Sequence, residues 1–348
     1  MKRGATSFFL VLVIASGAAL AAPRILVEPT WRDFGTVPLG SALTHTFLLM
    51  NAGDAPLVLS EAVTDCSCTE ATFEKGTLGP GESGALTVSY LVTGVGRERK
   101  SVVVRSNDPA RPRLTLYVGA TGSELLVAPT SLALRIRVLV DLRSPEAYAA
   151  EHLLGALSLP YAGTADGMPL LPRDAAMVLY DEEGASLDAA SAALQAIGPA
   201  RLELLQGGLR SWIAQVGGEL LASGPASDER FLSPDTLPAS GAPSVPSPLD
   251  PLALRESFLV LVDLRRPEEY ALVHLAGAVN VPTDRLSSWA EDLPKDVEIV
   301  LYDETGEALS VAQALGEQGF TVVKALFGGL AQWRTGLGDR LLVTSTAP

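Results

Sequence analysis

The C-terminal two thirds of this chain contain an internal repeat, which limits the folds that the chain can adopt. The segment Val138–Glu146 reads VLVDLRSPE, and 122 residues later Val260–Glu268 reads VLVDLRRPE. Further matches follow at this offset, or at 121 after one deletion: Tyr148 and Tyr270, His152 and His274, Gly155-Ala156 and Gly277-Ala278, Pro160 and Pro282, Tyr180-Asp181 and Tyr302-Asp303, Gly207-Gly208 and Gly328-Gly329, and Trp212 and Trp333. Two copies indicate a pair of domains of one fold rather than a solenoid.

Each copy alternates short apolar strands with helix-like segments. Strands are expected at 138–141, 177–180 and 202–205 in the first copy and at 260–263, 299–302 and 321–325 in the second, with helices at 187–197 and 309–318. This alternation predicts a parallel sheet covered by helices on both faces. Between the copies, residues 223–251 hold seven of the 24 prolines and six serines. That composition predicts an extended, semi-rigid linker at residues 222–251.

The N-terminus has the pattern of a secretory signal peptide. Lys2 and Arg3 precede an apolar run at residues 8–20, and Ala19-Leu20-Ala21 fits the small-residue cleavage rule. We therefore expect a signal peptide at residues 1–21, with an uncleaved anchor as the alternative. The run is too short to span a bilayer. The mature chain is expected to be periplasmic or secreted, without a membrane anchor.

Charge and composition exclude several classes of function. The net charge is −14, and residues 123–348 hold 15 Lys and Arg against 30 Asp and Glu, whereas residues 22–122 hold 9 against 10. Such acidity argues against a nucleic-acid partner. The two cysteines and three widely spaced histidines offer no recognisable metal-ligand cluster. We predict no metal and no cofactor.

Residues 24–122 read as a different, all-β module. Val, Thr and Leu are frequent, and turn signals separate expected strands at 25–28, 44–51, 57–63, 85–91, 100–106 and 113–120. Short strands at this spacing predict an Ig-like β-sandwich. The expected fold class is thus multidomain: an N-terminal all-β Ig-like sandwich followed by two α/β domains with parallel sheets.

At the motif level, both repeats resemble the rhodanese (sulfurtransferase) family. The pattern Asp-x-Arg-x-x-x-Glu-Tyr, in which the first copy has Ala147 in place of the Glu, then His-x-x-Gly-Ala, then Gly-Gly-x-x-x-Trp covers roughly residues 131–221 and 252–341. The resemblance implies a loop after the second strand that begins with a catalytic cysteine. In that family, backbone N–H groups at a helix N-terminus and a nearby cation stabilise the anionic persulfide and its donor.

This chain departs from that pattern at the decisive loop. The positions of the cysteine, the glycine and the cation are occupied by Asp181, Gly184 and Ser186 in the first repeat and by Asp303, Gly306 and Ala308 in the second. A carboxylate cannot accept sulfane sulfur to form a persulfide, so the resemblance implies two inactive loops. Two interpretations remain open for the aspartates: a nucleophile, or a helix cap that occupies the N–H cradle as an internal anion.

Other repeated residues have structural interpretations beside functional ones. Asp141 with Arg143, and Asp263 with Arg265, could contact a ligand or tie the first strand to a loop. The histidines of the repeat are candidates for hydrogen-bonded structural residues, and the two tryptophans for core aromatics with a polar end.

The N-terminal module resembles a bacterial exported domain family of unknown function, similar to the Ig-like domains of major sperm protein and hydin. The resemblance rests on FGTV at 34–37, FLLMNAG at 47–53, DCSCT at 65–69 and LGPGE at 78–82. The family usually has Cys-Gly-Cys, where this chain has Ser67. Cys66 and Cys68, expected on one face of a strand, could form a disulfide, bind a soft ion such as Cu(I) or serve packing alone.

The sequence therefore predicts an exported, non-catalytic rhodanese-domain protein. Its expected role is protein–protein scaffolding or ligand sensing, and its expected partner is another exported protein. The alternative is an accessory sulfur or redox carrier that uses Cys66 and Cys68.

Overall fold

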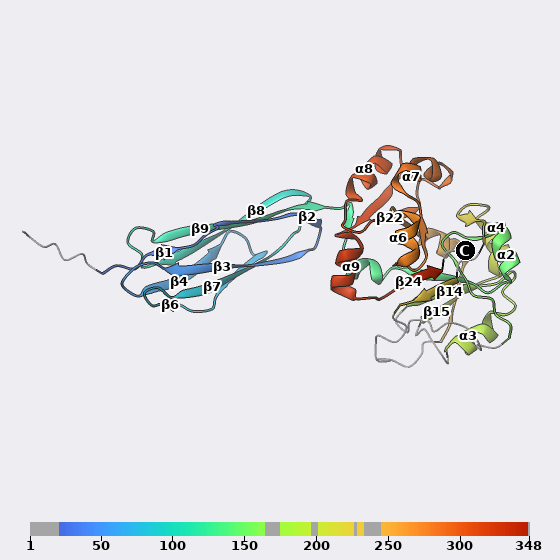
Figure 1. Ribbon diagram of the computed structural model, residues 1–348, viewed down its shortest axis with the longest axis horizontal. Coiled ribbons are helices and arrows are strands. Elements are labelled where there is room, and N and C mark those ends of the chain that lie inside the picture. The colour runs from blue at the N-terminus through green and yellow to red at the C-terminus, as the bar shows by residue number, and fades with distance from the viewer. Residues whose placement is uncertain (1–20, 164–174, 196–200, 226–227, 233–244, 347–348) are drawn as a thin grey trace, which may run out of the picture. The chain divides into compact units, whose positions relative to one another are not determined.

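The fold is that of a computed structural model, in which residues 21–163, 175–195, 201–225, 228–232 and 245–346 are described (Figure 1). The expected signal peptide lies outside these residues except for Ala21. Among the helices of the described ranges, none is long and apolar enough to cross a membrane. The described residues form two compact units: one holds residues 21–36 and 40–122, and the other holds 37–39 and the residues from 123 onward.

The first unit consists of two β-sheets. One has the strand order β1-β3-β7-β5 and the other β2-β9-β8-β4-β6, and the pairs within β1-β3-β7-β5 and β9-β8-β4-β6 are antiparallel. The strands are β1 Ile25–Leu26, β2 Trp31–Pro38, β3 Ala42–Asn51, β4 Leu57–Thr64, β5 Thr69–Phe73, β6 Thr77–Leu78, β7 Ser83–Leu91, β8 Gly96–Ser106 and β9 Arg113–Ser123.

Alternating apolar residues give each of these sheets a buried face. Phe47 and Leu49 of β3 are buried, as are Val102 and Val104 of β8, while their neighbours along each strand are more exposed. This period of two follows from the opposite orientation of successive side chains in a strand. The sequence analysis did not predict strands β2 and β5.

The second unit contains both repeats, and each repeat has a five-stranded parallel sheet. The first repeat contains β10 Leu126–Val127, α1 Pro129–Ala133, β11 Arg137–Asp141, α2 Pro145–Ala150, β12 His152–Leu153, β13 Leu157–Ser158, β14 Ala176–Tyr180, α3 Leu187–Gln195, β15 Arg201–Leu205, α4 Gly208–Gln215 and β16 Leu221–Ala222. Its sheet has the order β13-β11-β14-β15-β18, in which β18 comes from the other repeat.

The second repeat follows the same plan. It contains β17 Asp228–Phe231, β18 Ser247–Leu249, α5 Pro251–Glu256, β19 Leu259–Asp263, α6 Pro267–Leu272, β20 His274–Leu275, β21 Ala278–Asn280, α7 Thr283–Trp289, the 3₁₀ turn η1 Ala290–Asp292, β22 Glu298–Tyr302, α8 Leu309–Glu317, β23 Val322–Leu326, α9 Gly329–Leu337 and β24 Leu342–Thr346. Its sheet has the order β10-β23-β22-β19-β21.

The two repeats exchange one short strand each. Strand β10, the first strand of the first repeat, pairs with β23 of the second, where Leu126 lies opposite Ala325. Strand β18, which lies directly before α5 of the second repeat, pairs with β15 of the first, where Pro248 lies opposite Leu204. Each sheet is therefore completed by the other repeat, and the two apolar core clusters both contain residues of both repeats.

The expected linker at residues 222–251 differs from the prediction in its described parts. Strand β18 belongs to the first repeat's sheet, and β17 pairs with β24 of the second repeat. Asp250 accepts hydrogen bonds from the N–H groups of Leu252 and Ala253 and so caps α5. Proline content misled the prediction because β18 is an edge strand, where a missing N–H costs little.

Candidate functional site

The candidate site of each repeat is the loop that follows its second long strand, at the carboxyl end of β14 or β22. Helix α4 holds the first loop, because the N–H groups of Leu209 and Arg210 donate to the carbonyls of Asp181 and Glu182 at 2.9 and 3.0 Å. Gly208 is required there, since a Cβ on it would lie 2.5 Å from the carbonyl oxygen of Asp181. The equivalent contacts from α9 hold the second loop.

In the first loop, the Asp181 carboxylate occupies the N–H cradle. Its Oδ1 accepts from the N–H groups of Glu183 (3.1 Å) and Gly184, and its Oδ2 accepts from the N–H (2.7 Å) and hydroxyl (2.6 Å) of Ser186. The side chain is buried, with the residue 8% exposed. Gly184 adopts φ +86°, which lets the loop turn its N–H groups inward. A carboxylate is thus the anion at the centre of this loop.

The second loop has the same arrangement with fewer contacts. The Oδ1 atom of Asp303 accepts from the N–H groups of Thr305 (2.9 Å) and Gly306. Ala308 stands where the first loop has Ser186, so this position supplies no hydroxyl to the carboxylate. Of the two aspartates, Asp181 is therefore the more firmly held.

The second residue of each loop, Glu182 or Glu304, forms an ion pair with the arginine of the Asp-x-Arg motif in the same repeat. Arg143 binds the carboxylate of Asp141 with two nitrogens and donates from Nη1 to Glu182 at 3.0 Å. Arg265 does the same with Asp263 and with Glu304 at 3.1 Å. Burial disfavours the charge on Arg143, but its bonds to Asp141 outweigh that effect and raise the pKa of Arg143. Both arginines are therefore engaged in ion pairs within their own repeat.

The first loop carries one more cation, which the sequence analysis did not consider. Arg210 of α4 pairs with Glu183 and lies 3.7 Å from Glu182. The second repeat has Ala331 at this position. Arg210 consequently offsets part of the negative charge of Glu182 and Glu183, which the loop sequence alone does not reveal.

The other repeated residues hold the scaffold together. Each histidine bonds through Nδ1 to the carbonyl of the tyrosine four residues earlier at 2.8 Å, and its ring stacks on that tyrosine. Burial lowers the pKa of His152. The indole N–H groups of Trp212 and Trp333 donate to the carbonyls of Glu219 and Arg340. These contacts match the structural interpretations of both residue types.

Cys66 and Cys68 form a disulfide bond with each other. They lie in the turn between β4 and β5, and not on a strand as the sequence analysis expected. The turn is fixed by the N–H of Leu91 of β7, which donates to the Cys68 carbonyl at 3.0 Å. In the described ranges, no group of three His, Cys, Asp or Glu side chains gathers in a way that could hold a metal ion.

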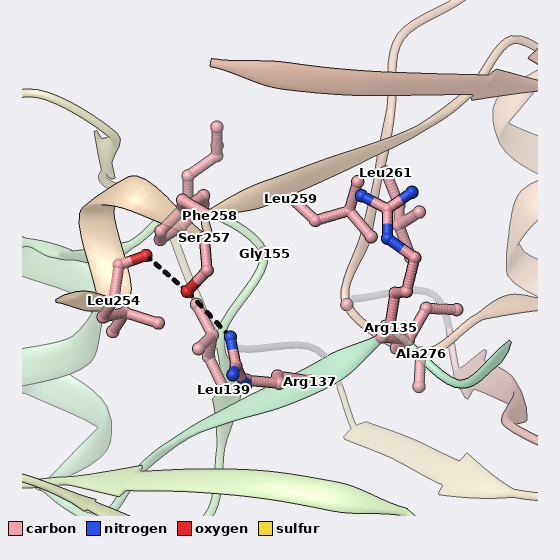
Figure 2. Close-up of a pocket in the computed structure, with 13 residues that line it drawn as sticks. Arg135, Arg137, Leu139, Gly155, Leu254, Ser257, Phe258, Leu259, Leu261 and Ala276 are labelled. Carbon is pink, nitrogen blue, oxygen red and sulfur yellow. Dashed lines mark hydrogen bonds between the residues drawn. The ribbon is translucent and has the colours of Figure 1, made fainter. Parts of the chain in front are cut away.

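A small cavity lies where the two repeats meet (Figure 2). Arg137 reaches across it and donates from Nη1 to the Ser257 hydroxyl at 2.8 Å. The hydroxyl of Ser257 lies 3.4 Å from the carbonyl of Leu254. The cavity measures about 20 Å³, which is room for about one water. It is a feature of the packing between repeats and is too small for a substrate.

Comparison with known families agrees with this architecture. The rhodanese-like domain family matches residues 129–215 and 251–335, and a family described as a protein of unknown function, DUF1573, matches residues 25–121. The thiosulfate sulfurtransferase GlpE of Pseudomonas fluorescens Pf-5 is 38% identical over 85 residues, which are 24% of this chain and 77% of that protein. The chain belongs to the rhodanese-like family.

Two further matches concern the rhodanese-like repeats. GlpE of Coxiella burnetii RSA 331 is 34% identical over 82 residues, which cover 23% of this chain and 77% of that protein. The solution structure of the rhodanese-like domain of Alr3790 from Anabaena sp. is 27% identical, covers 26% of this chain and 66% of that chain, and has a TM-score of 0.23. The prediction of a DUF-type module followed by two rhodanese-like domains is confirmed at this level.

Proposed function

We propose that this rhodanese-like protein is an exported pseudoenzyme that binds a partner and transfers no sulfur. The observation that carries the proposal is the Asp181 carboxylate, which takes up the N–H groups of its own loop. A sulfurtransferase needs those dipoles for an anionic persulfide and donor. Here the same dipoles are satisfied within the chain.

Sulfur chemistry gives a second reason. Persulfide formation requires a thiolate that attacks the sulfane sulfur of a donor, and a carboxylate forms no such product. The two cysteines of the chain are Cys66 and Cys68, outside both repeats and joined to each other. Both repeats thus present a loop that contains no thiol.

The proposal also includes export from the cytoplasm and binding to a second protein. The pattern at residues 1–21 supports export, and the N-terminal unit, which we propose to be an Ig-like sandwich, supports a binding role. The excess of acidic residues in the repeats favours a partner with a basic surface. A second exported protein fits these features.

A sulfurtransferase assay tests the proposal directly. Thiosulfate and cyanide are supplied to the mature protein and to a Cys66→Ser/Cys68→Ser variant, and thiocyanate is measured. We expect both to remain at the rate of the protein-free control. Thiocyanate formation by the double variant would overturn the proposal, because that protein contains no thiol.

The second candidate function is an accessory redox role for the N-terminal unit. It is favoured by one observation, the disulfide between two residues that are separated by a single position. Equilibration with defined ratios of oxidised and reduced glutathione, followed by alkylation and mass measurement, gives its reduction potential. A potential near that of the thiol–disulfide oxidoreductases supports this role, and one below about −300 mV, which is typical of structural disulfides, argues against it.

A further inference from the structure

Four side chains on the N-terminal unit form a cluster of rings and cations that the proposed function does not use. Trp31 of β2, Tyr117 of β9, and Arg97 and Arg99 of β8 line a hollow of about 530 Å³. The three strands are neighbours in one sheet. The hollow lies on the side of that sheet opposite its buried face, since Val102 and Val104 of β8 alternate with the exposed arginine positions.

The rings are fixed in place by the strands beneath them. Trp31 lies directly on Gly119, because a Cβ added to Gly119 would meet the Trp31 ring at 2.5 Å. The ring of Tyr117 lies 6.5 Å from that of Trp31, at an angle of 57°. Gly119 therefore makes room for an indole ring laid on the sheet, and the two rings form a preformed aromatic surface.

Two arginines lie beside the rings. The Arg99 guanidinium lies 4.9 Å from the centre of the Tyr117 ring, and Arg97 reaches Asp33 at 3.5 Å. Within the described part of the chain, Arg99 forms no ion pair with a carboxylate. A guanidinium stacked on a ring keeps its N–H edges available for two parallel bonds to a carboxylate.

We propose that this cluster, the Trp31–Arg99 surface, binds a saccharide that contains uronic acid. The C–H face of a sugar ring packs on Trp31, beside Tyr117, and its carboxylate accepts hydrogen bonds from Arg99. The hollow has the size of a small-molecule site, which is about 300–1,000 Å³. No bond is made or broken in this step.

Two other classes of ligand fit the surface less well. An extended peptide binds at a sheet edge through main-chain hydrogen bonds, whereas this hollow spans the face of three strands and offers side chains alone. A nucleic acid requires a strongly basic surface, whereas residues 22–122 hold 9 basic against 10 acidic residues. A saccharide whose carboxylates are widely spaced suits a surface that offers two aromatic rings and two arginines.

Titration calorimetry with defined oligosaccharides tests the proposal on the mature protein. The probes are trigalacturonate and a hyaluronan tetrasaccharide, with neutral maltotriose, a hexaglutamate peptide and an oligothymidylate as comparisons. We expect at least one of the two uronate probes to bind, and maltotriose to bind at least about tenfold more weakly.

Variants locate the site. Trp31→Ala and Arg99→Ala should each weaken uronate binding about tenfold or more, and thermal unfolding reports whether each variant is folded. Arg105→Ala is the matched control, because Arg105 lies exposed on the same strand, outside the hollow and paired with Glu61. Should Trp31→Ala fail to fold, the comparison of Arg99→Ala with Arg105→Ala decides.

Several results would overturn the proposal. They are no binding of either uronate probe, equal binding of maltotriose, tighter binding of the peptide or the oligothymidylate, or an equal loss in the Arg99 and Arg105 variants. The proposal is independent of the state of the Asp181 loop.

Discussion

Asp181 and Ser186 are joined by two hydrogen bonds, from the backbone N–H and the hydroxyl of Ser186 to one carboxylate oxygen, at 2.7 and 2.6 Å. Ser186 directly precedes helix α3, so the carboxylate lies where the helix dipole favours negative charge. Ser186 thus supplies both a backbone and a side-chain donor to the Asp181 carboxylate.

The carboxylate of Asp181 should contribute measurably to stability. In Asp181→Ala, the N–H groups of Gly184 and Ser186 lose their acceptor, and we expect the free energy of unfolding to fall by about 2–3 kcal/mol. Asp303→Ala is the comparison, and its loss should be about 1 kcal/mol, since Asp303 accepts fewer bonds. Denaturant unfolding followed by tryptophan fluorescence measures both. A larger loss for Asp303→Ala would contradict the assignment of Asp181 as the better-held anion.

The contact between the repeats should be more sensitive at Gly155 than at Gly277. Both residues adopt positive φ, +76° and +80°, so an alanine at either costs about 1 kcal/mol. A Cβ on Gly155 would also lie 2.4 Å from the Gly277 carbonyl oxygen, whereas the nearest atom to a Cβ on Gly277 is at 3.4 Å. We expect Gly155→Ala to be the less stable variant by at least about 1 kcal/mol. Equal melting temperatures for the two variants would show that the backbone near Gly277 moves away from the added Cβ of residue 155 without loss of stability.

The sequence predicted the repeat, the parallel sheets and the loops, because these depend on local patterns. The run Val260–Asp263 is apolar and short, and it forms strand β19 almost as predicted. The exchange of β10 and β18 was not predictable in this way. Two-residue and three-residue strands carry little periodicity, and their pairing is decided by packing between segments far apart in the chain.

The site was predictable in part for similar reasons. The spacing from Asp181 to Gly184 to Ser186 suits a side chain that bonds to N–H groups two or more residues later, so the cap could be anticipated. The pairing of Glu182 and Glu183 with Arg143 and Arg210 could not be, because it joins residues from separate segments. The sequence analysis placed the cysteines on a strand, but β4 ends at Thr64 and β5 begins at Thr69, so Cys66 and Cys68 lie in the turn between them.

Protonation of His152 should destabilise the fold as the pH falls. Burial lowers the pKa of His152 from its ordinary value of 6.5, so the unfolded chain binds this proton more readily than the folded one. The free energy of unfolding should therefore decrease as the pH falls from about 7.5 to about 5.5. In His152→Gln the dependence should be shallower over that interval. An equally steep slope in the variant would assign the effect to other groups.

The disulfide should add little to the stability of the N-terminal unit. The bond joins residues two apart, so it closes a very short loop, and its removal should cost less than about 2 kcal/mol. Thermal unfolding with and without a phosphine reductant measures the effect, and Cys66→Ser/Cys68→Ser serves as the control that reductant cannot change. Complete unfolding of this unit on reduction would mean that the bond is an essential structural link.

Persulfide formation by redesigned loops tests whether Asp181 fills an anion-binding cradle. In the Cys66→Ser/Cys68→Ser background, Asp181→Cys is compared with Asp181→Cys/Ser186→Arg after incubation with thiosulfate. The thiolate attacks the sulfane sulfur and releases sulfite, and intact-mass measurement detects the added sulfur. If the loop is a cradle that Asp181 fills, the double change restores nucleophile and cation together and should gain sulfur at least about tenfold faster than the single change. The parent with Asp181 should gain none. Absence of sulfur uptake in the double change would contradict the account, because the loop would then hold no anion-binding cradle for the aspartate to fill.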